Sequence, residues 1–331
     1  MVDKIAGNRA DKPTSPPRHD PKVITALRRF AISITVFNIL GYTAFGFEQP
    51  WTWPFVAIAT GYTVEIVLEV IGARAEKRAP RFAGNGFRGL VEFLYPAHIS
   101  SVALNMLIYV NDQVLVMMFG VAVAVGAKWV LRAPVRGRLR HFMNPSNLGI
   151  AVILLLFPWA SIAPPYHFTE NVTNPIDWIV PAVIIVGGTM LNGMLTNRMW
   201  LIAGWVGVFA LQAVVRGVII DDISALGGLA MMTGVAFILF TNYMITDPGT
   251  SPSRPLSQVA FGGGVALVYG ALMGMNIPYA IFFATAIVCL VRGGFLWSLH
   301  IVNRTRELDA AKVSAAAAQA VAPGGKEVAK V

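Results

Sequence analysis

Apolar residues occur in blocks of about twenty, separated by short polar breaks, along most of this 331-residue chain. A helix of about twenty apolar residues is long enough to cross the hydrocarbon core of a bilayer. Because 56% of the residues are hydrophobic and only 13% are charged, the chain lacks the polar surface that a soluble protein of this length needs. The pattern predicts an all-α polytopic membrane protein with no sizeable soluble domain.

The apolar blocks predict ten transmembrane helices, five in each half of the chain. An odd number of spans per half inverts the second half relative to the first, so we expect two inverted five-helix repeats. The predicted spans are 30–46, 53–71, 90–110, 114–131 and 145–163 in the first half, and 176–195, 200–215, 225–245, 259–274 and 278–291 in the second.

The basic residues indicate how the chain is oriented. With ten spans, all of the 26 Lys and Arg residues except Arg216 fall on one side of the membrane. By the positive-inside rule, both termini lie in the cytoplasm, and we expect a multi-pass protein of the bacterial cytoplasmic (inner) membrane. The net charge of +9 is therefore explained by topology, and we expect the lipid bilayer, not nucleic acid, as the partner.

Five segments follow from this reading. They are a polar cytoplasmic N-terminal segment (1–22), a first five-helix repeat (23–163), an outer loop (164–175), a second five-helix repeat (176–306) and a disordered cytoplasmic tail (307–331).

Glycines mark the entry to the third predicted span of each half: Gly84, Gly86 and Gly89 in the first, and Gly227 and Gly228 in the second. Pro96 within the first of these spans also removes a helical hydrogen bond. Interrupted helices at corresponding places indicate a site between the halves. Close packing of helices explains the glycines equally well, so both interpretations stay open.

Four ionisable residues in the predicted spans are candidates for an ion or proton pathway: Glu65, Glu69, Glu92 and His98. A charged group in hydrocarbon has a large free-energy cost, and pairing with an opposite charge reduces this cost. Salt bridges from Glu69 or Glu92 to Lys128, Arg88 or Arg132 are the simpler expectation. A relay through Glu65 and His98 is the functional alternative, and Glu65 lies closest to the middle of the membrane.

The chain has few residues that could form a catalytic or metal site. The single cysteine, Cys289, excludes disulfides and cysteine-held clusters within one chain. The sequence contains no pattern of nucleophile and base and no phosphate-binding loop. We therefore predict no catalytic residues and no metal site, and at most an electron-transferring subunit of an enzyme complex.

Two loop-edge segments are more informative. The first contains Asn144, Pro145, Asn147 and Gly149, and the second contains Thr246, Asp247, Pro248 and Thr250. Read alone, Asn144 is a helix cap and Pro145 a first helical residue, while Asp-Pro-Gly is a turn signal.

Together, the two segments resemble a known family. Residues 144–149, followed by an apolar run that ends at Pro158, resemble the Asn-Pro-Ala-Met-Val-Gly…Phe-Pro segment of the NqrB/RnfD family. Residues 240–262 are similar to that family's Ala-Thr-Asp-Pro-Val-Thr-Ser-Pro…Phe-Gly segment. The resemblance extends loosely from Arg29 to Arg306. It implies a urea-transporter-like fold and a membrane subunit of the Rnf or sodium-translocating NADH:quinone oxidoreductase complexes, which works beside other membrane or redox subunits.

The resemblance also has a departure. In the family's flavin subunits, a threonine in a Ser-Gly-Ala-Thr-type motif of a long outer loop is esterified to FMN. Here the corresponding loop spans only residues 164–175, and its threonines, Thr169 and Thr173, lie outside such a motif. We therefore expect no covalent FMN. The cofactor stays open, with a noncovalent flavin or a quinone as the candidates and Thr169 and Thr173 as candidate contacts. The short form resembles RnfD-like membrane proteins of enediyne biosynthesis clusters.

The leading expectation is a membrane protein that takes part in electron transport or in ion translocation coupled to it. One alternative is a small-solute transporter or channel without redox activity, with a pore lined by Glu65, His98, Asn105 and Thr233. The other is an accessory membrane protein of natural-product biosynthesis.

Overall fold

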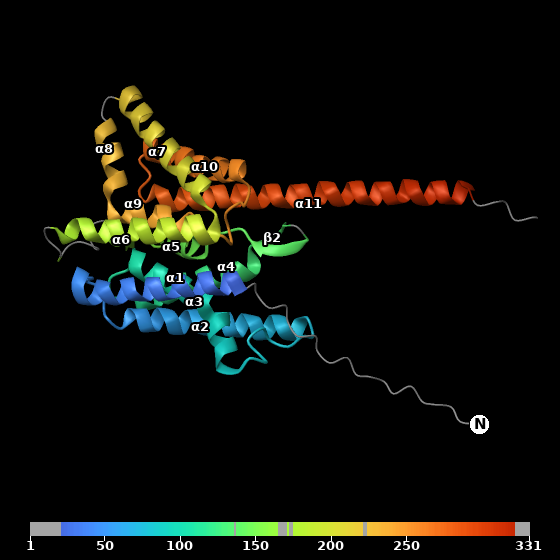
Figure 1. Ribbon diagram of the computed structural model, residues 1–331, viewed down its shortest axis with the longest axis horizontal. Coiled ribbons are helices and arrows are strands. Elements are labelled where there is room, and N and C mark those ends of the chain that lie inside the picture. The colour runs from blue at the N-terminus through green and yellow to red at the C-terminus, as the bar shows by residue number, and fades with distance from the viewer. Residues whose placement is uncertain (1–20, 136, 165–170, 172–174, 221–223, 322–331) are drawn as a thin grey trace, which may run out of the picture.

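The computed structural model describes residues 21–135, 137–164, 171, 175–220 and 224–321 (Figure 1). Seven helices in this part of the chain are long and apolar enough to cross a membrane. A further pair of helices, bent by 65° at a short break, meets the same criterion together and brings the number to eight. Because helices satisfy their backbone hydrogen bonds internally, they suit the bilayer core. The chain is a multi-pass helical membrane protein.

The first half of the chain forms three long helices and two shorter ones. The elements are α1 (Pro21–Leu40) with the π-helical turn η1 (Gly41–Phe45), α2 (Trp53–Ala75), α3 (Gly86–Leu107), α4 (Val114–Val130) and α5 (Pro145–Leu156). Two small antiparallel pairs join them: β1 (Ile108–Tyr109) with β4 (Ser161–Ile162), and β2 (Arg132–Val135) with β3 (Arg138–His141).

The second half begins with a helix that also ends in a π-helical turn. Its elements are α6 (Ile176–Met190) with η3 (Leu191–Thr196), α7 (Met199–Ile219), α8 (Ala225–Ala230), the 3-10 turn η4 (Met231–Thr233), α9 (Val235–Leu239), the π-helical turn η5 (Phe240–Met244), α10 (Pro255–Gly274) and α11 (Ala280–Val321). Helix α11 is the longest element and projects far beyond the bundle, at the end where the β2–β3 hairpin lies (Figure 1).

Three elements differ from the sequence-based expectations. Helix α3 continues through Pro96, whose carbonyl accepts a hydrogen bond from the Ser100 hydroxyl, so the first half has no break at that place. In the second half, the break falls at Gly234, whose extended backbone (φ −71°, ψ 141°) separates η4 from α9. Helix α5 ends at Leu156, and α11 continues to Val321, into the segment whose composition predicts disorder.

Several helix-packing contacts of the first half have counterparts in the second. In the first half, α2 packs on α3 and α4, α1 packs on α3, and α4 packs on α5. In the second half, α7 packs on α8 and α10, α6 packs on α9, and α10 packs on α11. Helices α5 and α11, the last of each half, pack on each other. The centre of the molecule is therefore built where the halves meet.

Close approach of α7 and α10 depends on glycine. A Cβ atom added to Gly204 would lie 2.6 Å from the Val259 carbonyl oxygen, so these helices pack backbone to backbone. Beside this contact, the fully buried rings of Trp205 and Phe209 pack on Phe237 of α9. The packing of these rings on Phe237 therefore holds α9 in position, and α9 forms a wall of the central cavity.

Candidate functional site

A cavity of about 1,300 Å³ lies between the two halves of the chain. Residues from α1 and α3 line one side, and residues from α9, η5 and the start of α11 line the other. The lining is mainly aliphatic and aromatic, and its aromatic residues include Phe30, Phe37, Phe209, Phe237, Tyr243 and Tyr269. Polar and charged side chains, among them Glu65, Lys128 and Asp247, interrupt it. Ligand sites in proteins are typically apolar and aromatic, with a few polar groups that fix the ligand's orientation. This cavity has that composition.

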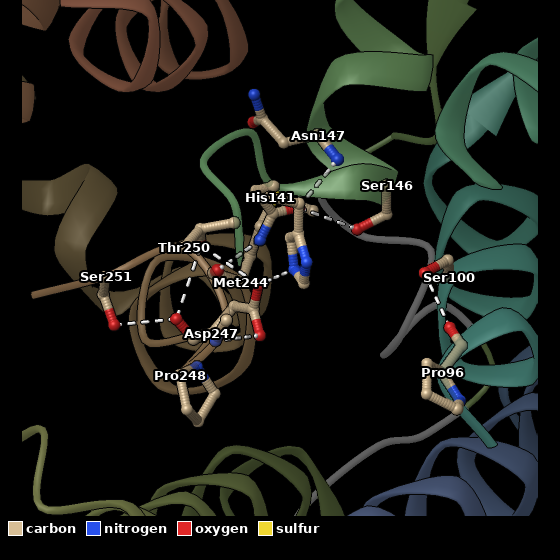
Figure 2. Close-up of polar contacts among 12 residues, drawn as sticks. Pro96, Ser100, His141, Ser146, Asn147, Met244, Asp247, Pro248, Thr250 and Ser251 are labelled. Carbon is tan, nitrogen blue, oxygen red and sulfur yellow. Dashed lines mark hydrogen bonds and ion pairs between the residues drawn. The ribbon is translucent and has the colours of Figure 1, made fainter. Parts of the chain in front are cut away.

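The two family-like segments meet at the cavity, although they are far apart in the sequence. The Asn144 side-chain amide donates a hydrogen bond of 2.8 Å to the Met244 carbonyl oxygen, so the start of α5 is joined to the end of η5. His141 Nε2 lies 4.0 Å from Asp247 Oδ2. Figure 2 shows His141 and Asp247 beside each other, with Pro96 and Ser100 of α3 apart from them. All four residues line the cavity, and His141 also lines a second, smaller cavity. The sequence did not indicate this contact between the segments.

Asp247 holds its own turn together. Its carboxylate accepts hydrogen bonds from the Gly249 backbone N–H (3.1 Å) and from the Thr250 hydroxyl (3.0 Å). Its backbone carbonyl accepts a further bond of 2.7 Å from the Ser251 hydroxyl. Because short polar side chains that bond to nearby backbone stabilise turns, these contacts explain the Asp-Pro-Gly sequence structurally.

Asn144 caps helix α5 as its sequence predicts. Its side-chain oxygen accepts a hydrogen bond of 3.0 Å from the Asn147 backbone N–H, and Pro145 occupies the first helical position. The Asn147 side-chain amide donates to the Phe282 carbonyl oxygen of α11 at 2.9 Å. Gly149 packs against the Gly120 backbone, where there is no room for a side chain. The first segment therefore joins α5 to α4 and α11.

The His141 ring is neutral at neutral pH. Burial lowers its pKa below the usual value of 6.5, and the nearby Lys128, Arg132 and Arg140 lower it further, while Asp247 opposes them. A neutral ring forms no ion pair, so the 4.0 Å approach of His141 to Asp247 is a polar contact and not a salt bridge.

Glu65 and Lys128 form a buried ion pair in the cavity wall. Lys128 Nζ lies 2.9 Å from Glu65 Oε2, and each side chain is only 9% exposed. Within the described part of the chain, neither of these atoms has another polar partner. The pair joins α2 to α4 and places two opposite charges in the wall of the cavity.

The other acidic candidates lie outside the cavity lining. The buried Glu69 carboxylate pairs with Arg78 and Arg81 and also accepts a hydrogen bond from the Arg81 backbone N–H at 2.7 Å. Glu92 pairs with Arg88 one helical turn away at 2.8 Å. Lys128 of α4 is therefore paired with Glu65 of α2 and not with Glu69 or Glu92, because those two carboxylates pair with arginines near them in the sequence.

His98 is held between two hydroxyl groups. Its Nε2 lies 2.7 Å from the Thr35 hydroxyl of α1, and its Nδ1 lies 3.0 Å from the Tyr62 hydroxyl of α2. These contacts tie α1, α2 and α3 together without any charged partner. They show how the ring is oriented but leave its role as a proton carrier a prediction.

The structure brings six of the sequence-selected residues to the central cavity: Glu65, Asn144, Pro145, Thr246, Asp247 and Pro248. Three further family-motif residues do not line the cavity but contact the residues or helices around it: Asn147, Gly149 and Thr250. Thr169 and Thr173 lie outside the described residues. Sequence reasoning missed the aromatic lining, because phenylalanines and tyrosines are common throughout membrane helices and carry no signal of their own.

Comparisons with known proteins give no match. No protein-family model matches this chain, and no curated protein matches its sequence.

Proposed function

We propose that this chain binds a planar redox ligand, a noncovalent flavin or a quinone, in the central cavity and takes part in membrane electron transfer. The observation that carries the proposal is the cavity of about 1,300 Å³, whose aromatic and aliphatic lining is interrupted by polar and charged side chains. Ligand pockets of roughly 300 to 1,000 Å³ hold drug-sized molecules, so this space accommodates a fused ring system with part of an apolar tail.

The polar groups of the cavity suit such a ring. The Glu65–Lys128 pair and the Asn144–Asp247 region provide charged and hydrogen-bonding groups at a few fixed places. Quinone and flavin carbonyl oxygens accept hydrogen bonds, and charge near the ring tunes its electronic properties. The protein would supply binding, orientation and electrostatics, and the redox chemistry would belong to the ligand.

The proposal includes the family and the topology. The chain would be an NqrB/RnfD-like subunit with ten spans in two inverted repeats, with both termini in the cytoplasm of a bacterial inner membrane, beside partner subunits. The repeated packing of α2–α3–α4 and α7–α8–α10 supports two related halves. Helices α4 (17 residues) and α5 (12 residues) would complete the first five.

A second candidate function rests on the broken span. The bend of 65° between η4 and α9 exposes non-helical backbone at Gly234, and Thr233 and Gly234 line the cavity. Broken helices carry substrate sites in many transporters. A small-solute transporter without redox activity is therefore the competing proposal.

An absorption spectrum of the purified protein separates the two. The redox proposal expects a flavin or quinone signal that changes on chemical reduction. A colourless protein that contains no extractable quinone and carries solute across liposome membranes would favour the transporter.

A further inference from the structure

A second cavity, of about 50 Å³, lies beside the β2–β3 hairpin. Four segments line it: the β2–β3 hairpin, the turn before α7, the loop between η5 and α10, and α11. Its polar lining consists of Arg140, His141, Arg198, Ser251, Ser253 and Arg292. Three guanidinium groups from distant parts of the chain therefore converge on one small space.

These three cations are not neutralised by the described residues. In the described part of the chain, no carboxylate lies within salt-bridge distance of Arg140, Arg198 or Arg292. The closest acidic influence is Asp247, whose carboxylate is already occupied by Gly249 and Thr250. The cavity therefore has an excess of positive charge.

Arg198 is the central residue of this group. It is only 7% exposed, and its Nε donates to the Ser251 hydroxyl at 2.8 Å. Its Nη1 donates to the Thr196 carbonyl oxygen at 3.0 Å and its Nη2 to the Pro248 carbonyl oxygen at 3.5 Å. Arg292 Nη1 donates to the Thr250 carbonyl oxygen at 2.7 Å. An arginine has five N–H donors in a rigid fork, so these bonds do not use all the donors of either guanidinium group.

The electrostatics agree with an anion-binding site. Burial lowers the pKa of Arg198 below 12.5, and the charges of Arg140 and Arg292 lower it further, while Asp247 raises it. Holding like charges together in a partly buried space is costly, and an anion between them would remove this cost.

We propose that this cavity binds one phosphate-sized oxyanion, either free phosphate or the phosphate of a larger molecule. A volume of about 50 Å³ accommodates one such group and little more. Arginine forks bind phosphate oxygens in a bidentate way, and the Ser253 hydroxyl in the lining is a further donor.

General attraction between interfacial arginines and lipid head groups does not explain the arrangement. Exposed arginines meet lipid phosphates at the membrane surface. Arg198 is too buried to do so, and it lines the cavity instead. An anion bound there would bridge both halves of the chain, because the β2–β3 hairpin belongs to the first half and the other three lining segments belong to the second.

Calorimetric titration of the full chain in neutral detergent tests the proposal, with inorganic phosphate as one probe and dioleoyl phosphatidylglycerol as the other, at constant ionic strength. The expected result is saturable binding of at least one probe. Arg140→Gln is the main variant, because Arg140 is exposed and its replacement should not disturb folding. Loss of one charge-assisted contact should weaken binding about tenfold or more.

Arg254→Gln is the matched control, because Arg254 is also exposed and basic but does not line the cavity. It should bind like the wild type. Binding of inorganic phosphate identifies a free anion, whereas binding of phosphatidylglycerol alone identifies a lipid head group. The proposal is overturned if neither probe binds, or if Arg140→Gln and Arg254→Gln have equal affinities.

Discussion

Asp247 acts mainly as a structural residue of its turn, and this leads to a prediction at the residue scale. Asp247→Ala removes the acceptor for Gly249 N–H and the Thr250 hydroxyl, which should lower the free energy of unfolding by about 1–3 kcal/mol. Thermal melting of the purified variant, followed by tryptophan fluorescence, measures this loss. Asp112→Ala is the control, because Asp112 is exposed and its carboxylate accepts only from the exposed Gln113 side chain. Equal melting of both variants would refute the role of the turn.

His141 predicts a specific pH dependence. Its pKa is lowered in the folded protein, so the unfolded chain binds a proton at a higher pH than the native one. Stability from the neutral ring is therefore complete above the usual pKa of 6.5 and is lost as the pH falls below it towards the lowered native value. The melting temperature of wild type should fall between about pH 7.5 and 5.5, and His141→Gln should show a smaller fall. An identical pH profile for both proteins would contradict this assignment.

The packing of α7 on α10 gives a prediction at the scale of elements. Gly204→Ala would put a Cβ atom against the backbone of Val259 and should destabilise the protein by about 1–3 kcal/mol. Gly207 lies on the same helix with open space around it, so Gly207→Ala should be neutral or stabilising by up to about 1 kcal/mol. Melting curves of the two variants in the same detergent compare them directly. If Gly204→Ala is no less stable than Gly207→Ala, the close contact is wrong.

The ion pair between α2 and α4 is best tested by a double-mutant cycle. Lys128→Met alone leaves the buried Glu65 charge unpaired, and such a loss costs about 3–5 kcal/mol. Glu65→Leu alone should be similarly harmful, whereas the double variant replaces the pair by apolar groups and should be more stable than either single one. Melting temperatures of the three variants measure the coupling. Additive losses would show that the two residues act independently.

The sequence predicted a helical, multi-pass membrane fold and several local contacts, because each depends on neighbouring residues, whereas its count of ten spans stays a prediction. The Asn144 cap, the start of α5 at Pro145 and the Glu92–Arg88 pair are all of this kind. Contacts between distant segments could not be predicted. The bond from Asn144 to Met244 and the convergence of Arg140, Arg198 and Arg292 depend on the packing of the halves, which no local pattern encodes. The sequence did not single out Gly234 as the place of the break, because Gly227 and Gly228 in the same span tolerate a non-helical backbone equally well.

At the scale of the whole molecule, the two halves of the chain, which share several packing contacts, enclose a cavity of about 1,300 Å³. The charged and polar groups of its wall come from both halves: Glu65 and Asn144 from the first, and Asp247 from the second. A ligand bound between them would therefore depend on the assembled protein and not on either half alone. We propose that the ligand of this cavity is a planar redox molecule.

Ligand content of the purified protein tests that claim most directly. Solvent extraction followed by mass spectrometry should recover a flavin or quinone in about equimolar amount from wild type. Ala236→Trp, which fills the cavity from α9, should contain little of it. The control Val183→Trp, at a position 55% exposed on α6, should retain it. Recovery of no flavin or quinone from wild type, or equal amounts from the wild type and Ala236→Trp, would contradict the account.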